Sequence, residues 1–366
     1  MNRRDLLKSA PALALASCAP KENPGVTRLH FHSRQLQLKH TWTTVMSSST
    51  VRETFHVEYS RDGITGRGEG APIIRYNESA AQAIERLEKE RPWLEAADPW
   101  QFTKLMHQVF DKVEANFAAK AALDIALLDW VTQRLGIPLY RFFGLDPAGA
   151  PVTTFSIGID TADVVRRKTE EAAQFPVLKI KVGLDNDEEI IRAVRSVTDK
   201  PLRVDANEGF KTKEAAVEKI LWLEQQGVEF VEQPMPAASL EDMNWIRARV
   251  HVPIIADESC LHPEDIPRLA PHFDGVNIKI DKCGGLLEGW RMIQIARALG
   301  LKTMLGCMIS SSCAITAAAH LSPLVDYADL DGHLLIANDP FTGVEVVDGR
   351  LRLPSTPGLG LRLRES

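Results

Sequence analysis

The feature that most constrains the fold is a regular spacing of predicted strand ends along the second half of the chain. Between positions 181 and 329, short apolar runs end in a charged residue or a glycine. Successive ends are 22 to 27 residues apart. A strand, a loop, a helix and a return loop need about that many residues. Each interval therefore predicts one βα unit, with ends at Lys181, Asp205, Glu232, Asp257, Lys279, Gly306 and Asp329.

Polar residues near these ends also recur two positions apart. Side chains alternate along a strand, so residues i and i+2 share a face. The pairs are Lys179 with Lys181, Asp205 with Asn207, Lys279 with Asp281, and Asp329 with Asp331. Seven or eight such units close into an α/β barrel, which presents its active site at the carboxyl ends of the strands. An open doubly wound sheet is the alternative, but it needs a glycine-rich phosphate turn after an early strand, which this sequence lacks.

Composition narrows the class of partner. The chain has 366 residues, 43 of them basic and 49 acidic, with a net charge of −6. No basic stretch is long enough to indicate nucleic-acid binding. We therefore expect a small-molecule partner, and the length allows two domains.

The N-terminus has the order of features found in bacterial export signals. Arg3-Arg4 precedes a short apolar run, roughly Leu6 to Ser17, and Cys18 follows in a sequence that resembles a lipobox. The run is too short to span a bilayer. We expect residues 1–27 to be a twin-arginine or lipoprotein-like signal and linker, and the protein to be exported, either periplasmic or anchored through a lipid on Cys18. An ordinary cytoplasmic start that happens to contain two arginines is the alternative.

The rest of the chain divides into two predicted domains. We expect an α+β domain at 28–150, the barrel at 151–340, and a C-terminal segment at 341–366 that returns to the first domain.

The predicted α+β domain begins with strands and continues with helices. Two β-rich runs within Arg28–Glu58 flank a polar loop, His40–Thr50, and Asp62-Gly63 predicts a hairpin turn before a third strand. Helical patterns follow at Glu78–Val113 and Ala118–Leu135, the second ending at a glycine.

Three carboxylates, Asp205, Glu232 and Asp257, end successive strands and are expected to converge at the barrel mouth. Ionised carboxylates that lie side by side need a cation. Hard oxygen ligands suit Mg²⁺ or Mn²⁺, with water and substrate oxygens completing the coordination. The alternative is that each carboxylate caps or pairs with the following helix. Because the three occur in successive strands, we predict a metal site.

Lys181 and Lys279 come from the strands on either side of these carboxylates and are expected to face each other across the barrel. A lysine in a semi-enclosed site near a metal can have its pKa lowered towards the range of a general base. One lysine would remove a proton next to a substrate carboxylate and the other would return it on the opposite face, while the metal stabilises the enediolate. Lys179 is expected to lower the pKa of Lys181 by like charge and to bind the substrate carboxylate. Snorkelling surface lysines are the alternative, which the apolar flanks disfavour.

Together these motifs resemble the muconate-lactonizing subgroup of the enolase superfamily. The matching motifs are Gly-Glu-Gly-Ala-Pro at 68–72, Lys179-x-Lys181, Asp205-x-Asn207, Glu232-Gln-Pro, Asp257-Glu258-Ser259, and Lys279-x-Asp281 followed by Gly284-Gly285. The resemblance covers nearly the whole chain after the expected signal. It implies a modified (β/α)₇β barrel with an α+β capping domain and the metal ligands and lysines named above. It also implies supporting roles for Asn207, Glu258 and Asp281.

Within that subgroup the chain resembles the dipeptide epimerases. The resemblance is carried by Asp329-x-Asp331 and by Gly306-Cys-Met308, and Gly306 and Met308 are expected in the substrate site. In that family such an aspartate pair holds the α-ammonium of the substrate, which agrees with the acceptor-only chemistry of carboxylates. The resemblance implies an isomerase that inverts the Cα of the C-terminal residue of a dipeptide. We also expect a homo-oligomer.

Two positions differ from relatives that act on Ala-Glu. Those relatives carry an arginine in the mobile capping loop, whereas His40–Thr50 offers Ser and Thr at that place and Arg52 lies further on. Ser310 stands where many relatives have an acidic residue. The accepted side chains are therefore left open. Candidates for lining the site are Lys39, Trp42, Met46 and Arg75.

Other functions are also compatible with the motifs. A muconate-type cycloisomerase, an N-acyl amino acid racemase or an o-succinylbenzoate synthase would use the same lysines and metal without an ammonium site. A lipid-anchored solute-binding protein that has lost catalysis is the alternative outside enzymes, and the intact Lys181 and Lys279 disfavour it.

Overall fold

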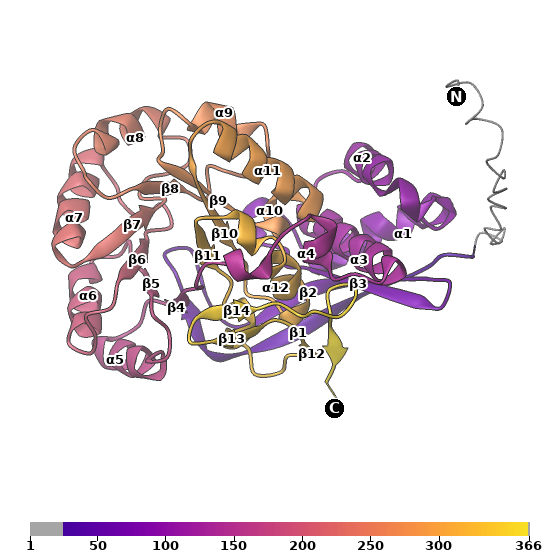
Figure 1. Ribbon diagram of the computed structural model, residues 1–366. Helices are drawn as coiled ribbons and strands as arrows, with labels where there is room; N and C mark the ends of the chain where they lie inside the picture. Colours follow the sequence, from indigo (N-terminus) through magenta and orange to yellow (C-terminus); the bar gives the residue numbers. More distant parts are fainter. Residues whose placement is uncertain (1–24, 365–366) are drawn as a thin grey trace, which may run out of the picture.

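A computed structural model describes residues 25–364 and places an eight-stranded barrel beside a smaller capping domain (Figure 1). The expected signal segment and Cys18 lie outside these described residues. Within the described part of the chain, no helix is long and apolar enough to cross a membrane.

The capping domain begins with an antiparallel sheet in the order β1-β2-β3, made of β1 (Arg28–Thr43), β2 (Ser48–Arg61) and β3 (Ile64–Gly70). The hairpin turn at Asp62-Gly63 forms as predicted, because both residues have positive φ, at 52° and 75°. The polar loop is shorter than predicted. The strand pairing continues to Thr43 and resumes at Ser48, so most of His40–Thr50 lies in strands.

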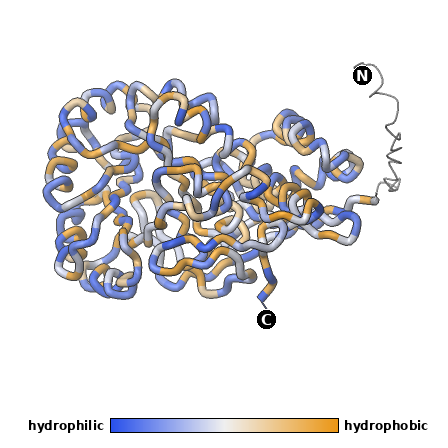
Figure 2. The backbone as a smooth tube through the Cα atoms, in the orientation of Figure 1, coloured by the Kyte–Doolittle hydropathy of each residue, from blue (hydrophilic) through white to orange (hydrophobic). Residues whose placement is uncertain are grey.

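Helices cover one face of this sheet. They are α1 (Ala80–Ala96), α2 (Phe102–Lys112) and α3 (Phe117–Leu135), which ends at Gly136 with φ 71° as predicted. Figure 2 shows hydrophobic residues along α3, which is buried over most of its length between the sheet and the barrel. The predicted single helical region from Glu78 to Val113 is two helices, because Asp98 and Pro99 start a separate 3₁₀ turn between them.

The backbones of β3 and α3 lie so close together that the residues of β3 facing the helix have no room for side chains. Gly66, Gly68 and Gly70 line one side of the strand, and a Cβ atom on Gly68 would lie 1.9 Å from the carbonyl oxygen of Ala122. The equivalent atoms on Gly66 and Gly70 would lie 2.0 Å from carbonyl oxygens of α3. The glycines let the helix lie against the strand backbone, which fixes the position of the capping helices.

The barrel contains eight parallel strands in sequential order. They are β4 (Phe155–Ile157), β5 (Leu178–Lys181), β6 (Leu202–Asp205), β7 (Val228–Glu232), β8 (Ile254–Ala256), β9 (Gly275–Ile278), β10 (Lys302–Gly306) and β11 (Tyr327–Asp329). A parallel bridge between Thr153 and Ala328 joins the first strand region to the last. The predicted α/β barrel with a capping domain is confirmed.

Helices surround the barrel between successive strands (Figure 1). They are α5 (Ala162–Glu171), α6 (Asp187–Arg195), α7 (Lys213–Gln225), α8 (Leu240–Arg247), α9 (Asp265–Leu269), α10 (Ile280–Cys283), α11 (Leu286–Ala298) and α12 (Ser312–Ala319). A short helix, α4 (Leu139–Phe142), connects the capping helices to the barrel.

No α-helix follows β11 in the described chain; a 3₁₀ turn at Gly332–Leu335 takes its place. Strand β1 of the capping domain covers this position. The backbone N–H of Ala337 donates to the carbonyl of Gln37, and the N–H of Gln37 donates to Oδ1 of Asn338 at 2.7 Å. The first strand of the chain therefore completes the last unit of the barrel.

The C-terminal segment contacts both domains. It contains β12 (Phe341–Thr342), β13 (Glu345–Val347), β14 (Arg350–Arg352) and β15 (Arg362–Leu363). The N–H of Leu359 donates to Asp129 on α3 at 2.8 Å, whereas the carbonyl of Gly349 accepts from Thr153 at the start of the barrel at 2.8 Å. The tail thus reaches the capping helices, as expected, and also the base of the barrel.

Buried carboxylates of the capping domain cap helices of the barrel. Glu69 on β3 accepts from the backbone N–H groups of Ser311 and Ala314 at the start of α12, at 2.9 and 3.1 Å. Asp124 on α3 accepts from the N–H of Leu286, the first residue of α11, at 2.5 Å. Helix N-termini present unpaired N–H groups that favour a negative charge. These contacts lock the capping domain onto the end of the barrel that carries the predicted site.

Candidate active site

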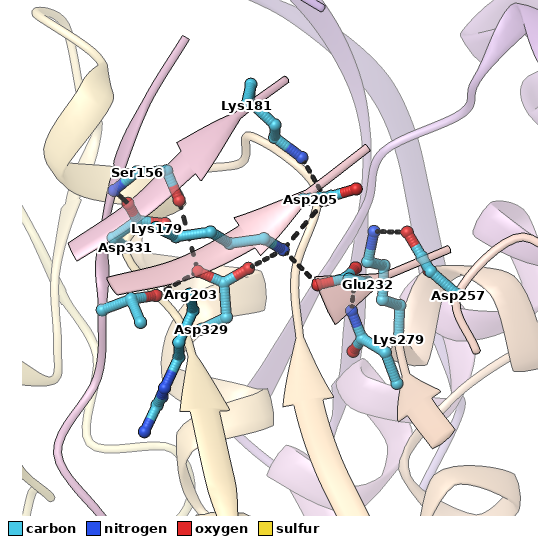
Figure 3. A network of polar contacts seen from close by, with 12 residues as sticks. Ser156, Lys179, Lys181, Arg203, Asp205, Glu232, Asp257, Lys279, Asp329 and Asp331 are labelled. Carbon is cyan, nitrogen blue, oxygen red and sulfur yellow. Dashed lines mark hydrogen bonds and ion pairs between the residues drawn. The ribbon is translucent and has the colours of Figure 1, made fainter. Parts of the chain in front are cut away.

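The predicted site residues come together at the carboxyl ends of the barrel strands (Figure 3). Lys181, Asp205 and Glu232 are the last residues of β5, β6 and β7, and the sheet register aligns them directly. Asp257 and Lys279 follow immediately after β8 and β9. The strand phase inferred from the sequence is therefore correct at these positions.

Asp205, Glu232 and Asp257 are fully buried and offer oxygen atoms that all lie within 4.8 Å of one another. Within residues 25–364, they form the one such group with metal-ligand chemistry. Burial and the neighbouring charge of Asp205 raise the pKa of Glu232 to about 8. Three crowded carboxylates need positive charge, and an all-oxygen donor set fits a hard divalent cation such as Mg²⁺.

Lys181 pairs with Asp205 at one end of the row of three carboxylates, and Lys279 pairs with Asp257 at the other end (Figure 3). Nζ of Lys181 is 2.5 Å from Oδ2 of Asp205, and Nζ of Lys279 is 2.8 Å from Oδ2 of Asp257. Burial acts to lower the pKa of Lys279, but Asp257 and Glu232 outweigh it, so the net pKa lies above its ordinary value. In this electrostatic environment, the carboxylates keep Lys279 protonated.

Lys179 is almost completely enclosed, with 1% of its side chain exposed. Its Nζ lies 2.7 Å from both Glu232 and Asp329 and 3.1 Å from Asp205. The ammonium therefore connects the candidate metal ligands to the last strand of the barrel. The expectations that Lys179 binds a substrate carboxylate and lowers the pKa of Lys181 stay predictions.

Asp329 and Asp331 are held by polar groups of β4. Oδ1 of Asp329 accepts from the hydroxyls of Thr154 and Ser156, and Oδ2 of Asp331 accepts from the N–H of Ser156 at 2.6 Å. Burial and Asp329 raise the pKa of Asp331 to about 7. Burial also acts to raise the pKa of Asp329, but Lys179 outweighs it and the net pKa is lowered.

Thr154 and Ser156 were missed by the sequence reasoning. They stand two residues apart in Thr-Phe-Ser-Ile, the alternation that puts two polar side chains on the inner face of a strand. That signal was available. It was overlooked because β4 has only three residues and lies before the spaced series.

Lys282 is a second residue that the sequence did not single out. It is buried, and its Nζ donates to Oδ1 and to the carbonyl of Asp257, both at 2.6 Å. With Lys279 on the other oxygen, two ammonium groups fix the orientation of Asp257. The sequence offers no signal for this, because a lysine three residues beyond a strand end is usually solvent-exposed.

Among the predicted supporting residues, Asn207 and Glu258 lie beside the carboxylates. The N–H of Asn207 donates to Asp205 at 3.0 Å, and Nδ2 donates to Glu258 at 3.1 Å. Asn207 and Gln233 adopt φ of 40° and 36°, a backbone conformation that non-glycine residues rarely adopt. Such strain clusters at functional sites, where surrounding contacts maintain it.

The expected shared face of Lys279 and Asp281 is wrong. Strand β9 ends at Ile278, and Asp281 lies in the short helix α10. Its Oδ1 accepts from the N–H of Ala71 in the capping domain at 2.7 Å. Asp281 therefore joins the two domains. The strands at Asp205 and Asp329 also end before the second member of each pair, so the alternation holds within a strand only for Lys179 and Lys181.

Gly306 pairs with Asp329 in the sheet register, at the floor of the site. A Cβ atom there would lie 2.5 Å from Oδ1 of Asn277, whose Nδ2 donates to Glu232 at 2.8 Å. Met308 follows in the loop, and its carbonyl accepts from the hydroxyl of the buried Ser310. Gly306 thus leaves room for the amide that orients a candidate metal ligand.

The lining candidates separate into two groups. Lys39 and Trp42 line a cavity of about 250 Å³, together with residues of α5 and with Ser156, which contacts Asp329 and Asp331. Met46 and Arg75 meet each other above the barrel mouth, where Nη1 of Arg75 lies 3.6 Å from Sδ of Met46.

Comparison with known proteins gives consistent matches over both domains. Residues 32–144 match the mandelate racemase / muconate lactonizing enzyme N-terminal domain, and residues 160–366 match the enolase C-terminal domain-like family.

Two sequence relatives cover nearly the whole chain. It is 42% identical to the L-Ala-D/L-Glu epimerase of Bacteroides thetaiotaomicron, over 98% of this chain and 99% of that protein. It is 44% identical to the L-Ala-D/L-amino acid epimerase of Pedosphaera parvula, over 92% of this chain and 99% of that protein.

Among solved structures, the dipeptide epimerase of Enterococcus faecalis complexed with Mg and L-Leu-L-Tyr superposes with a TM-score of 0.85. It is 33% identical and covers 92% of this chain and 99% of that chain.

Proposed function

Because the chain belongs to the enolase superfamily, as an isomerase with the mandelate racemase / muconate lactonizing enzyme domains, we propose that it inverts the Cα of the C-terminal residue of a dipeptide. The observation that carries the proposal is that Lys181 and Lys279 pair with the first and the last of three buried carboxylates on successive strands (Figure 3). Inversion of a carbon needs a proton-transfer group on each face.

Asp205, Glu232 and Asp257 would hold a divalent cation, Mg²⁺ by analogy with the Enterococcus faecalis complex. When bound, Mg²⁺ would neutralise the negative charge that develops on the substrate carboxylate in the enediolate. Lys282 donates to Asp257 and Asn277 donates to Glu232, so each fixes the orientation of one candidate ligand. The Mn²⁺ alternative has the same oxygen preference and is tested by the same experiment.

The two lysines carry the proton transfer in this proposal. A substrate carbon placed between Lys181 and Lys279 would lose its proton to the neutral amine of one lysine and gain a proton from the ammonium of the other. The base must be neutral before the step, so the charge of the surrounding carboxylates has to be offset by other cations in the site. Lys179, Lys282 and the bound cation would supply that offset.

The Asp329 and Asp331 pair distinguishes a dipeptide from substrates without an amine. Both are buried acceptors at the side of the site next to Lys179. An α-ammonium there would find two carboxylates, whereas the N-acyl or lactone substrates of the alternative enzymes would leave them without a cationic ligand. The names of the relatives support the dipeptide class.

We also propose export, with residues 1–27 as the signal. The charged start, the apolar run and Cys18 support this proposal. Cell fractionation tests it: Cys18→Ser should release the protein from the membrane fraction if Cys18 is lipidated, and cytoplasmic recovery of the full-length protein would contradict export. Size-exclusion chromatography with light scattering tests the expected homo-oligomer.

The main test incubates the mature protein with Mg²⁺ or Mn²⁺ and an L,L-dipeptide library in D₂O. We expect a one-unit mass gain in particular dipeptides and the appearance of their L,D epimers. Lys181→Ala and Lys279→Ala should each abolish inversion, whereas Lys302→Ala, at an exposed position on β10, should leave it intact. No exchange with any dipeptide would rule out the proposal, and a lysine variant that still inverts would rule out the two-lysine mechanism.

A further inference from the structure

The segment Pro72–Asn77 of the capping domain lies over the loops that follow β6, β8 and β9. Ile74–Tyr76 form a single 3₁₀ turn, and Ile74 is 90% exposed. Burial raises the pKa of Tyr76, which also responds to the charges of Lys282 and Asp257 below it. The N–H of Ala71 donates to Asp281 after β9, and Arg75 pairs with Glu208 after β6, so the segment crosses between the loops that border the candidate metal site.

Arg75 bridges this segment to the barrel. Nη2 of Arg75 lies 2.6 Å from Oε2 of Glu208, which stands three residues after the metal-ligand candidate Asp205. Glu208 is itself fixed. Its other oxygen accepts from the N–H of Ala237 at 2.7 Å, its own N–H donates to the carbonyl of Gln233, and its φ is 66°. The ion pair thus holds the guanidinium at a set position over the mouth.

The other arm of the guanidinium has no strong partner. Nη1 of Arg75 lies 3.6 Å from Sδ of Met46, and a thioether is a weak acceptor. The Arg75 side chain is 34% exposed, and the contact of this arm with Met46 is exposed to solvent. A guanidinium presents several N–H donors in one plane, which suits a carboxylate ligand. Arg75 can therefore bind a second anion through Nη1 while Nη2 stays paired with Glu208.

In the proposed substrate pose, the side chain of the C-terminal residue would extend towards Nη1 of Arg75. The substrate carboxylate would bind the cation held by Asp205, Glu232 and Asp257, the ammonium would lie at Asp329 and Asp331, and a lysine would face each side of the inverted carbon. The strands close the site from below. In this pose the side chain of the C-terminal residue would extend towards the capping domain, where Arg75 is the one charged residue in segments 44–47 and 72–77.

We propose that Arg75 binds an anionic side chain on the C-terminal residue of the substrate, so that the enzyme favours dipeptides ending in glutamate. The inference rests on the proposed function. The arginine that the first capping loop lacks is thereby supplied by the second capping segment, and Glu208 acts as the residue that positions it.

The test compares L-Ala-L-Glu with L-Ala-L-Gln, which have nearly the same shape and differ in the side-chain charge. The measurement is kcat/KM for epimerisation of each, followed by deuterium incorporation from D₂O. We expect the wild type to prefer the glutamate substrate and Arg75→Gln to reduce that preference about tenfold or more, since a hydrogen bond to a charged group contributes that much. Arg75→Lys should keep part of the preference, because it retains the charge without the planar fork.

The control is Arg166→Gln, which removes an exposed arginine paired with Asp163 on α5, outside the barrel mouth. It should leave the glutamate-to-glutamine ratio unchanged. An unchanged ratio in Arg75→Gln, or a wild type that turns over neutral dipeptides but does not favour glutamate, would overturn the inference and leave the epimerase proposal intact. Absence of exchange with every dipeptide would instead overturn the proposed function.

Discussion

The two carboxylates proposed to bind the substrate amine differ in their affinity for protons. Lys179 outweighs burial at Asp329 and lowers its pKa, whereas burial and the charge of Asp329 raise the pKa of Asp331 to about 7. Only an ionised carboxylate attracts an ammonium group strongly. Asp331 is therefore the member of the pair whose charge changes near neutral pH.

Asp331→Asn should weaken substrate binding more than it slows the chemical step. The substitution keeps an oxygen that can accept from the N–H of Ser156, as Oδ2 does now at 2.6 Å, but removes the charge. We expect KM for a dipeptide to rise about tenfold or more, as for loss of a charged hydrogen bond. Steady-state kinetics checks this. An unchanged KM would remove Asp331 from the amine site. An N-acetylated dipeptide is the control: it has no ammonium group, so both proteins should handle it equally, and an equal loss with both substrates would show that the substitution acts by another route.

The pH dependence of the reaction should contain the titration of Asp331. Its raised pKa means that it is protonated below about pH 7 and ionised above it. The kcat/KM for a dipeptide should therefore rise as pH increases through about 7, and Asp331→Asn should lack this limb of the profile. A variant profile that keeps the same limb would assign the titration to another group.

At the residue scale, the sequence predicted strand ends better than side-chain partners. Lys181, Asp205 and Glu232 could be placed because one residue at each strand end follows from the spacing alone. Asp281 could not, because the strand before it ends at Ile278 and the chain turns into a helix. Lys282 could not either, since its burial depends on the backbone carbonyl and side chain of Asp257, which another unit contributes.

Among the elements, α3 determines how the capping domain meets the barrel. Its burial against β3 depends on three glycines that leave no room for a Cβ atom. The sequence identified α3 as a helix from its apolar pattern and its terminal Gly136. It did not reveal the partner strand, because helix periodicity describes a buried face without identifying what covers it.

Gly68→Ala should destabilise the protein by about 1–3 kcal/mol, the usual cost of adding volume to a packed contact. The new Cβ would lie 1.9 Å from the carbonyl oxygen of Ala122, so β3 and α3 must move apart. Urea unfolding followed by circular dichroism measures the change. Gly149→Ala is the matched control, because its Cβ would lie 3.6 Å from Pro323, an ordinary contact. Equal midpoints for the two variants would contradict the close packing.

For the whole molecule, the candidate metal site joins strands that span the centre of the barrel. Mg²⁺ that binds the folded state alone should raise the free energy of unfolding with the logarithm of its concentration above the dissociation constant, by about 2.7 kcal/mol at a hundredfold excess, and so raise the unfolding temperature. Differential scanning fluorimetry with MgCl₂ and with a chelator measures this shift. Asp257→Asn should reduce it strongly, and Asp326→Asn, at a partly exposed position before β11, should retain it. A shift of the same size in Asp257→Asn would place the binding elsewhere.

The architecture as a whole was the most predictable level. Repeated βα units determine a barrel because each unit packs against the next, so the period alone predicts the closed sheet. The missing helix after β11 was implied by the family resemblance but not by the spacing. The contacts that replace it join Gln37 to residues 337 and 338, and no local pattern encodes a partner 301 residues away.

The hydrogen bonds between β1 and residues 336–338 also matter while the chain is being made. The ribosome releases Gln35–Leu38 early and their partners almost last, so this edge of the capping sheet stays uncovered through most of translation. An uncovered strand edge can pair with strands of other chains. Premature stop codons shortly before Ile336 are therefore expected to yield insoluble protein, although every proposed catalytic residue would already have been translated.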